Sequence, residues 1–140
     1  MKTSYPVVDN IKNTYIAKSP IHGQGLFAEV KFSKESVLGY LDGQRMSWDF
    51  FDSLKKLYDE QGDHLYGEWN AIDENTLLVR AIRTKYGFIN HSRNPNVEIR
   101  HCPMRLVALK DIAIDEELTL DYRKEPLRKE YLDGHGKSYL

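Results

Sequence analysis

Three short segments hold most of the residues that could do chemistry in this chain. The first, residues 18–28, contains Gly23 and Gly25. Closely spaced glycines permit positive φ angles and let a ligand approach the backbone, although a plain turn between two strands has the same composition. The segment is not a dinucleotide fingerprint, because no third glycine opens a helix and the apolar run that follows predicts a strand.

The second segment, residues 87–96, reads GFINHSRNPN. Its composition is typical of a turn, but Asn90, His91 and Ser92 directly follow the apolar pair Phe88 and Ile89. Polar side chains that become buried there need hydrogen-bonding partners. A polar ligand can supply them, and so can the protein itself, so the segment alone leaves both roles open.

The third segment, residues 115–122, reads DEELTLDY. The acidic run is typical of a solvated turn that leads into a short strand. Tyr122 has two readings: a core aromatic whose hydroxyl is hydrogen-bonded internally, or a hydroxyl that faces a substrate.

Short strands must position these segments. Apolar and β-branched runs between turn-forming clusters predict seven of them: Thr14–Ala17, Leu26–Val30, Val37–Leu41, Thr76–Ile82, Val97–His101, Arg105–Leu109 and Leu118–Leu120. Two helices are predicted, one capped by Ser47 and one over Pro126–Asp133 that ends before Gly134. Many short strands with few helices favour a β-rich fold.

Composition limits the class of protein. A length of 140 residues favours one domain with one core. The 20 Lys and Arg residues nearly balance the 21 Asp and Glu residues, which gives no reason to expect nucleic acid as a partner. With Cys102 as the only cysteine, neither an intrachain disulfide nor a cysteine-cluster zinc site is expected. No apolar run predicts a secretory signal or a membrane span, so we expect a cytoplasmic protein, or one that enters a host without a classical signal.

Taken together and in this order, the three segments resemble the motifs of the SET domain, a family of S-adenosylmethionine-dependent protein methyltransferases. The resemblance rests on Ile21–Ala28, Phe88–Asn96 and Glu116–Tyr122, and it covers roughly Asn13 to Glu125. It implies a mainly β fold of small curved antiparallel sheets, with few short helices and a C-terminal pseudoknot. Residues 1–140 would form a single SET domain with its core at 13–125, and residues 126–140 would complete the site.

The same resemblance implies roles for individual residues. The expected contacts of the cofactor S-adenosylmethionine are His22, Gly23, Gln24, Gly25, Phe27, Asn90 and His91. Tyr122 would line the channel that receives the target lysine, and Tyr40 would be a second catalytic tyrosine. Leu120 and Ile99 would line that channel too. Leu120 stands where many members carry the Phe or Tyr that limits how many methyl groups are added, so this smaller residue would leave space for higher methylation unless Ile99 fills it.

The chain departs from the family pattern at several positions. Tyr40 is followed by Gly43 after one residue more than the family motif has, so either Tyr40 or Leu41 fills the tyrosine position. Gly87 stands where an arginine is frequent, and Arg93 stands where a cysteine is frequent. The cysteine-rich zinc modules that flank many members are not expected, since Cys102 alone cannot form them, and this layout resembles compact viral and bacterial members.

The resemblance therefore predicts transfer of a methyl group to a lysine amine of a protein, with S-adenosylhomocysteine as the second product. The alternative is a catalytically silent SET module that binds a peptide or protein. A protein substrate is the expected partner, whereas nucleic acid, a membrane and a bound metal are not expected. The target, the degree of methylation and the oligomeric state, a homodimer included, stay open.

Overall fold

A computed structural model describes residues 6–65 and 67–140 and divides them into two compact units. The first unit contains the described residues up to Leu41 together with Thr84–Lys124. The second unit contains those of Asp42–Arg83 together with Glu125–Leu140. Each unit has its own cluster of buried apolar side chains, so the buried residues form two cores where the sequence suggested one.

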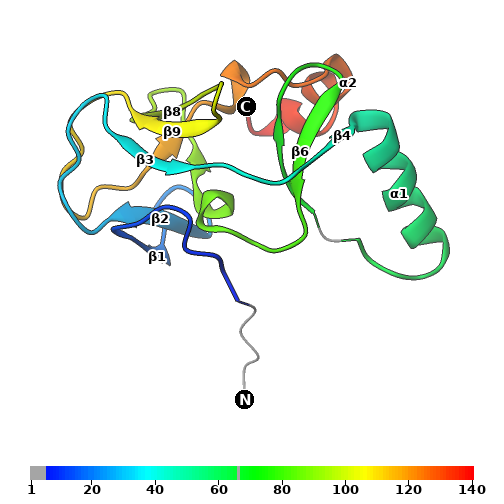
Figure 1. The fold of residues 1–140 in the computed structure, drawn as a ribbon, viewed down its shortest axis with the longest axis horizontal. Helices are drawn as coiled ribbons and strands as arrows, with labels where there is room; N and C mark the ends of the chain where they lie inside the picture. The colour runs from blue at the N-terminus through cyan, green and yellow to red at the C-terminus, as the bar shows by residue number, and fades with distance from the viewer. Residues whose placement is uncertain (1–5, 66) are drawn as a thin grey trace. The chain divides into compact units, whose positions relative to one another are not determined.

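Seven short strands build the first unit (Figure 1): β1 (Thr14–Lys18), β2 (Gln24–Ala28), β3 (Val37–Tyr40), β7 (Asn90–His91), β8 (Val97–Arg100), β9 (Arg105–Ala108) and β10 (Thr119–Leu120). β1 and β2 form an antiparallel pair, and the other five form a sheet in the order β3-β9-β8-β10-β7. Two 3₁₀ turns, η1 (Lys85–Phe88) and η2 (Tyr122–Lys124), adjoin β7 and β10.

Strand β10 has an unusual place in this sheet, because it is parallel to both of its neighbours. It pairs with β7 through Thr119 opposite Asn90 and Leu120 opposite His91, and with β8 through Leu120 opposite Val97. This register brings the second and third sequence segments side by side. The core beneath them is apolar and includes Ile11, Leu26, Leu38, Phe88, Ile89, Val97, Leu106, Ile112, Leu118 and Leu120.

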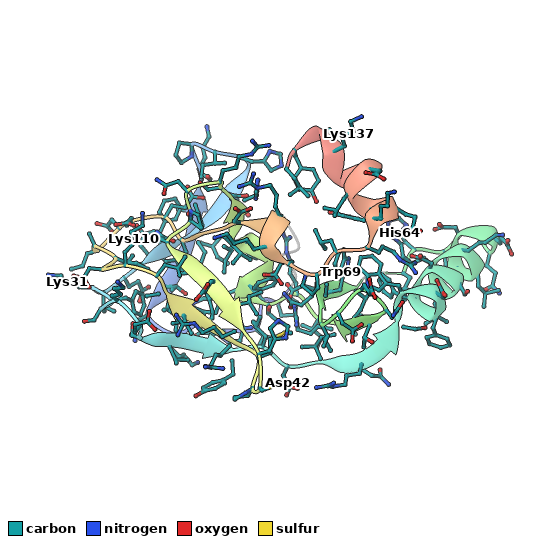
Figure 2. All side chains as sticks on the ribbon, turned by 90° about the horizontal axis from the view of Figure 1, so that it is seen from above. Lys31, Asp42, His64, Trp69, Lys110 and Lys137 are labelled. Carbon is teal, nitrogen blue, oxygen red and sulfur yellow. The ribbon has the colours of Figure 1, made fainter. Side chains whose placement is uncertain are left out.

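The loops at one end of the first unit are joined by an isolated bridge between Phe32 and Ile112. Lys31 and Lys110, which are labelled in Figure 2, lie on these two loops. Both lysines are exposed, as expected for loop residues outside the core.

A three-stranded antiparallel sheet in the order β4-β6-β5 forms the centre of the second unit. Its strands are β4 (Gln44–Ser47), β5 (Glu68–Ala71) and β6 (Thr76–Arg80), and its helices are α1 (Trp48–Glu60), α2 (Lys129–Asp133) and the 3₁₀ turn η3 (His135–Ser138). Ser47 caps α1 as predicted, since its Oγ accepts the Phe50 N–H at 3.0 Å.

Aromatic rings and one buried ion pair hold the second unit together. The Trp48 and Trp69 rings meet edge to face with centroids 4.9 Å apart, and the Tyr131 ring lies 5.7 Å from that of Trp69. Figure 2 labels Trp69 among the side chains of this unit. The Arg80 Nε lies 2.6 Å from a Glu68 carboxylate oxygen, and both side chains are buried. This pairing satisfies two charges that would otherwise be costly to bury.

The second helix is shorter than predicted, since the prediction placed its start at Pro126. Arg128 has an extended backbone with φ −71° and ψ 151°, so α2 begins only at Lys129. Ion pairs from the Arg128 guanidinium to Asp49 at 3.1 Å and Asp52 at 3.4 Å stabilise this extended approach. The predicted helix end before Gly134 is confirmed.

The observed strands support the predicted β-rich fold, but three of them were not predicted. β4, β5 and β7 are two to four residues long, too short for an alternating apolar pattern to become visible. β2 starts and ends two residues earlier than predicted, because it pairs residue by residue with β1 from Thr14–Ala28 to Lys18–Gln24. None of the helices in the described residues has the length and apolar composition of a membrane span.

Candidate functional site

Ser19 organises the glycine turn between β1 and β2. Its N–H donates to the carbonyl oxygen of Gly23 at 2.8 Å, and its Oγ accepts the N–H of Ile21 at 2.9 Å and of His22 at 3.4 Å. Gly23 has a φ of +47°, in the region that favours glycine, and a Cβ added there would meet no described atom within 4 Å. The backbone at Gly23 is therefore open to approach from outside.

Gly25 is needed for a different reason. A Cβ at this position would overlap Oε2 of Glu117 and lie 2.9 Å from the Glu117 Cδ and 3.1 Å from the Ser19 Cβ. Only a residue without a side chain lets β2 pass this closely to the carboxylate. The first segment therefore rests directly against the third.

Asn90 on β7 joins all three segments. Its Nδ2 lies 3.1 Å from the carbonyl oxygen of His22, 3.2 Å from that of Gln24 and 3.0 Å from Oε2 of Glu117. Because an amide NH₂ carries two hydrogens, these three acceptors share them. The side chain of Asn90 thus fixes the glycine turn and Glu117 relative to each other.

His91 and Tyr122 meet across the β7–β10 pair. The His91 Nδ1 accepts the backbone N–H of Tyr122 at 3.1 Å, and the two rings have centroids 5.2 Å apart. Since Nδ1 accepts a hydrogen bond, the neutral imidazole carries its proton on Nε2. The hydroxyl of Tyr122 donates to the carbonyl oxygen of Ile89, which places that hydroxyl directly beside the Asn-His segment.

Asp121 supports the same corner from the interior. Its side chain is 2% exposed, and its two carboxylate oxygens accept hydrogen bonds from the Arg123 guanidinium at 2.9 and 2.8 Å. The Arg123 side chain lowers the pKa of the Asp121 carboxyl from its ordinary value. The carboxylate therefore stays charged. Through Arg123 it anchors η2, the 3₁₀ turn whose first residue is Tyr122.

The match to known families agrees with this geometry. A family model described as the SET domain matches residues 23–123, which include both glycines of the first segment, all of the Asn-His segment and Tyr122. The chain belongs to the SET domain family.

Curated relatives of this SET domain are much longer proteins. A histone-lysine N-methyltransferase described as specific for H3 lysine-4, from Emericella nidulans, is 35% identical over 124 residues. A protein of the same description from Saccharomyces cerevisiae is 34% identical over 128 residues, and the histone-lysine N-methyltransferase trithorax of Drosophila virilis is 30% identical over 125. Each alignment covers 81% of this chain but only 10%, 11% and 3% of the respective relative.

Among the predicted channel residues, Tyr40 is exposed and Leu120 is buried in the core. Tyr40 lies on β3 opposite Arg105 with 59% of its surface exposed, and no hydrogen bond or ring contact joins it to Tyr122 in the part of the chain that the structure describes. Leu120 is 2% exposed and belongs to the first unit's core, where Ile99 packs as a half-buried neighbour. Their roles in a lysine channel stay predictions.

Phe27 lies on β2 behind the glycine turn. Its ring stacks on that of Tyr15 with centroids 5.5 Å apart and an interplanar angle of 18°. Its backbone forms an isolated bridge with Glu117. Phe27 therefore supports the turn from the strand side, and its contact with the cofactor stays a prediction.

Sequence reasoning missed Asn96 and Glu117 as organising residues. Asn96 is 4% exposed; its Nδ2 donates to Oε2 of Glu116 and to the backbone carbonyl of Glu117, each at 2.8 Å, and its Oδ1 accepts the Thr119 N–H at 2.8 Å. The acidic run had been interpreted as a solvated turn, yet Glu116 and Glu117 are half-buried. The one available signal was that both segments recur together in the family motifs.

Residues 126–140, which are expected to complete the site, include Tyr131, Leu132 and Tyr139. In the second unit, Tyr131 packs on the Trp48 and Trp69 rings, and its hydroxyl contacts that of Tyr139. Leu132 is exposed at 36%. Packing of the tail on the second unit's own core is therefore what the contacts show.

Proposed function

We propose that this SET domain is a protein-lysine N-methyltransferase that uses S-adenosylmethionine. The observation that carries the proposal is the Asn90 amide, which hydrogen-bonds both to the glycine turn and to Glu117. Through these bonds, the three motifs of the family meet in one place within the first unit. Membership of the SET domain family and the description of relatives as histone-lysine N-methyltransferases support the same function.

The residues present fit the amino-acid end of such a methyl donor. The backbone at Gly23 is open where a Cβ would lie, and Asn90 and His91 are only half-buried. His22, Gly23, Gln24, Gly25, Asn90 and His91 would hold the donor, with Phe27 behind the turn. When bound, S-adenosylmethionine supplies a methyl group on a positively charged sulfur.

The protein must then hold a lysine amine in its neutral form, since only the lone pair can attack. An ordinary lysine has a pKa near 10.4, so neutralising it at pH 7 costs about 4 to 5 kcal/mol. An apolar channel lowers that cost because burial disfavours the charged amine. The Tyr122 hydroxyl can accept an N–H of the amine while donating its own hydrogen to the Ile89 carbonyl. It orients the amine without adding a charge, whereas a carboxylate in its place would favour the protonated lysine.

The substrate class follows from the relatives as part of the proposal. Three relatives are described as histone-lysine N-methyltransferases, and we propose a lysine of a basic protein such as a histone as the target. Because this chain aligns with only 10%, 11% and 3% of these relatives, the histone target is part of the proposal and is not taken from the whole relatives.

One observation favours the alternative, a catalytically silent SET module that binds a peptide. Tyr40, the predicted second catalytic tyrosine, is 59% exposed on β3. A SET domain with a single tyrosine hydroxyl at the lysine would orient the amine less firmly. Binding of the donor with no transfer would identify this alternative.

The test is transfer itself. The protein is incubated with S-adenosylmethionine carrying an isotopically labelled methyl group and with a cell lysate, and the label is located by mass spectrometry. Label on lysine side chains of protein is the expected result, and protein that has been heat-inactivated is the control. Donor binding shown by calorimetry without any labelled lysine would contradict the enzyme and support the silent module.

A further inference from the structure

The Glu117 carboxylate lies at the point where the glycine turn meets the Asn-His segment. Both of its oxygens are within hydrogen-bond distance of the Ser19 Oγ, at 2.9 and 2.8 Å, and Oε2 also accepts from the Asn90 Nδ2 at 3.0 Å. No Lys, Arg or His side chain forms an ion pair with Glu117 among the residues described. Ser19 and Asn90, the side chains that donate hydrogen bonds to Glu117, are uncharged, and each belongs to a segment of the proposed S-adenosylmethionine site.

Because Glu117 only accepts in these hydrogen bonds, its carboxylate sets the orientation of the Ser19 hydroxyl. A serine hydroxyl has one hydrogen and two lone pairs. With its hydrogen directed at Glu117, the Ser19 Oγ keeps its lone pairs for the N–H groups of Ile21 and His22, at 2.9 and 3.4 Å. An acceptor at residue 117 therefore determines which way the Ser19 hydroxyl points.

The same carboxylate also orients Asn90. Because Oε2 accepts from the Asn90 Nδ2, the amide presents its NH₂ to Glu117 and to the carbonyl oxygens of His22 and Gln24. The amide oxygen then faces the other way. Backbone pairing adds to this arrangement, since the Leu118 N–H donates to the carbonyl oxygen of Leu26 at 2.8 Å.

We propose that Glu117 is a positioning residue of the methyl-donor site, and this inference rests on the proposed function. Through Ser19 and Asn90 it fixes the conformation of residues 19–25 and the orientation of the Asn90 amide. It acts on these protein groups and not on the charge of the donor. Removing its charge should weaken binding of the donor and of the product by the same factor, since both share the amino-acid end.

The test is Glu117→Gln, which keeps the size of the side chain. The new amide must direct its NH₂ group at either the Ser19 hydroxyl or the Asn90 NH₂. Both of these groups donate hydrogen bonds to residue 117 in the wild type, so one hydrogen bond is lost. In the ligand-free protein, hydrogen exchange should become at least about tenfold faster at the Ile21 and His22 amides while staying unchanged in β8. Calorimetry should show about tenfold or greater weakening for both S-adenosylmethionine and S-adenosylhomocysteine. The KM of Glu117→Gln for the protein substrate should stay within about twofold of the wild-type value.

The matched control is Glu116→Gln, which removes the same charge one residue away. Its carboxylate accepts from Asn96 and from the Ala113 N–H, and it does not contact the glycine turn. This control should leave donor affinity and exchange at Ile21 and His22 unchanged. Ser19→Ala provides a second variant, and it should reproduce the faster exchange and weaker binding.

Three results would overturn the proposal. Exchange at Ile21 and His22 that equals the wild type in Glu117→Gln would do so, and so would equal weakening in the Glu116→Gln control. A loss confined to the charged donor, with product affinity unchanged, would show direct action on the ligand's charge. Failure of the proposed function is distinguishable, because it appears as wild-type protein that transfers no methyl group, whatever the exchange data show.

Discussion

At the scale of single residues, the site depends on one amide with more acceptors than hydrogens. The Asn90 Nδ2 lies within 3.2 Å of two backbone carbonyls and one carboxylate oxygen. A buried or half-buried donor of this kind contributes through the acceptors it satisfies, since an acceptor left unpaired costs about 1 to 3 kcal/mol. Asn90 therefore combines a structural role with its proposed place beside the methyl donor.

Asn90→Asp tests this role with almost no change in shape. The new carboxylate would face Glu117 and the carbonyl oxygens of His22 and Gln24 with no hydrogen to share. We expect a loss of about 1 to 3 kcal/mol in the free energy of unfolding, and at least about tenfold weaker donor binding. Urea unfolding and calorimetry measure both, with exposed Asn94→Asp as the control. Wild-type affinity in Asn90→Asp would show that the amide does not organise the site.

Residue types in the sequence predicted Asn90, His91 and Tyr122 because their motifs are long and specific. They did not predict Glu117, because an Asp-Glu-Glu run normally lies in solvent, and burial by partners distant in the chain leaves no local trace. For Tyr40, the motif suggested a role but did not determine which residue fills the tyrosine position. Its spacing to Gly43 left the tyrosine position open, and the pairing of β3 with β9 places the residue on an exposed surface.

At the scale of elements, the two glycines of the β1–β2 turn have separate physical requirements. Gly23 needs a left-handed backbone in open space, whereas Gly25 needs the absence of a side chain beside Glu117. A sequence motif with two glycines does not distinguish these requirements. Substitution of each by alanine does.

We predict that Gly25→Ala is the more damaging of the two. Its methyl group would displace the Glu117 carboxylate, which breaks the contacts to Ser19 and Asn90 and should abolish measurable donor binding. In the ligand-free protein, Gly23→Ala should cost only the strain of a left-handed alanine, about 1 to 2 kcal/mol in the free energy of unfolding. Its methyl group would enter the space proposed for the donor, so it should weaken donor binding, but it would leave Glu117 in place. Thermal unfolding and calorimetry of the two variants rank them. The reverse order would refute the close approach of β2 to Glu117.

The N-terminus of α1 offers a test in the second unit. Ser47→Ala removes the acceptor of the Phe50 N–H and should lower the free energy of unfolding by about 1 kcal/mol. Ser53→Ala, on the exposed part of the same helix, is the matched control. Its hydroxyl bonds back to the Asp49 carbonyl, so alanine there should be neutral or slightly stabilising. Equal effects of the two variants in urea unfolding would argue against the cap.

At the scale of the whole molecule, two units with separate cores share 140 residues. The pattern of short apolar runs between turns predicted a β-rich fold, and the observed short strands and few helices confirm it. The division into two cores was not predictable, because residues 42–83 leave the first unit and return to it without a Pro- or Gly-rich linker. The aromatic cluster of Trp48, Trp69 and Tyr131 shows the same limit, since these residues are far apart in the sequence.

The free energy of unfolding should depend on pH because of the Glu125 carboxyl in the second unit. Burial raises the pKa of the Glu125 carboxyl from 4.5 to about 7. Between these values the folded protein keeps a proton that the unfolded chain releases, so this contribution to stability is lost as pH rises through about 7. Glu125→Gln removes the titrating group.

We therefore expect Glu125→Gln to be more stable than the wild type at pH 8, by about 1 to 3 kcal/mol, with the difference vanishing near pH 4. Thermal unfolding across this range measures it. Exposed Glu74→Gln should show no such trend. A stability difference that stays constant from pH 4 to pH 8 would contradict a raised pKa at Glu125.

Lysine methylation is tested most directly by measuring both products of one reaction. The protein, S-adenosylmethionine and a protein substrate found by labelling are incubated together, and S-adenosylhomocysteine and methyl-lysine are quantified by mass spectrometry. We predict one S-adenosylhomocysteine for each methyl group found on lysine. Tyr122→Phe should still bind the donor while both products fall together by about one to two orders of magnitude, in the range typical of a lost positioning group. Undiminished formation of both products by Tyr122→Phe would remove that residue from the mechanism, and donor binding by the wild type with neither product formed would contradict the central claim.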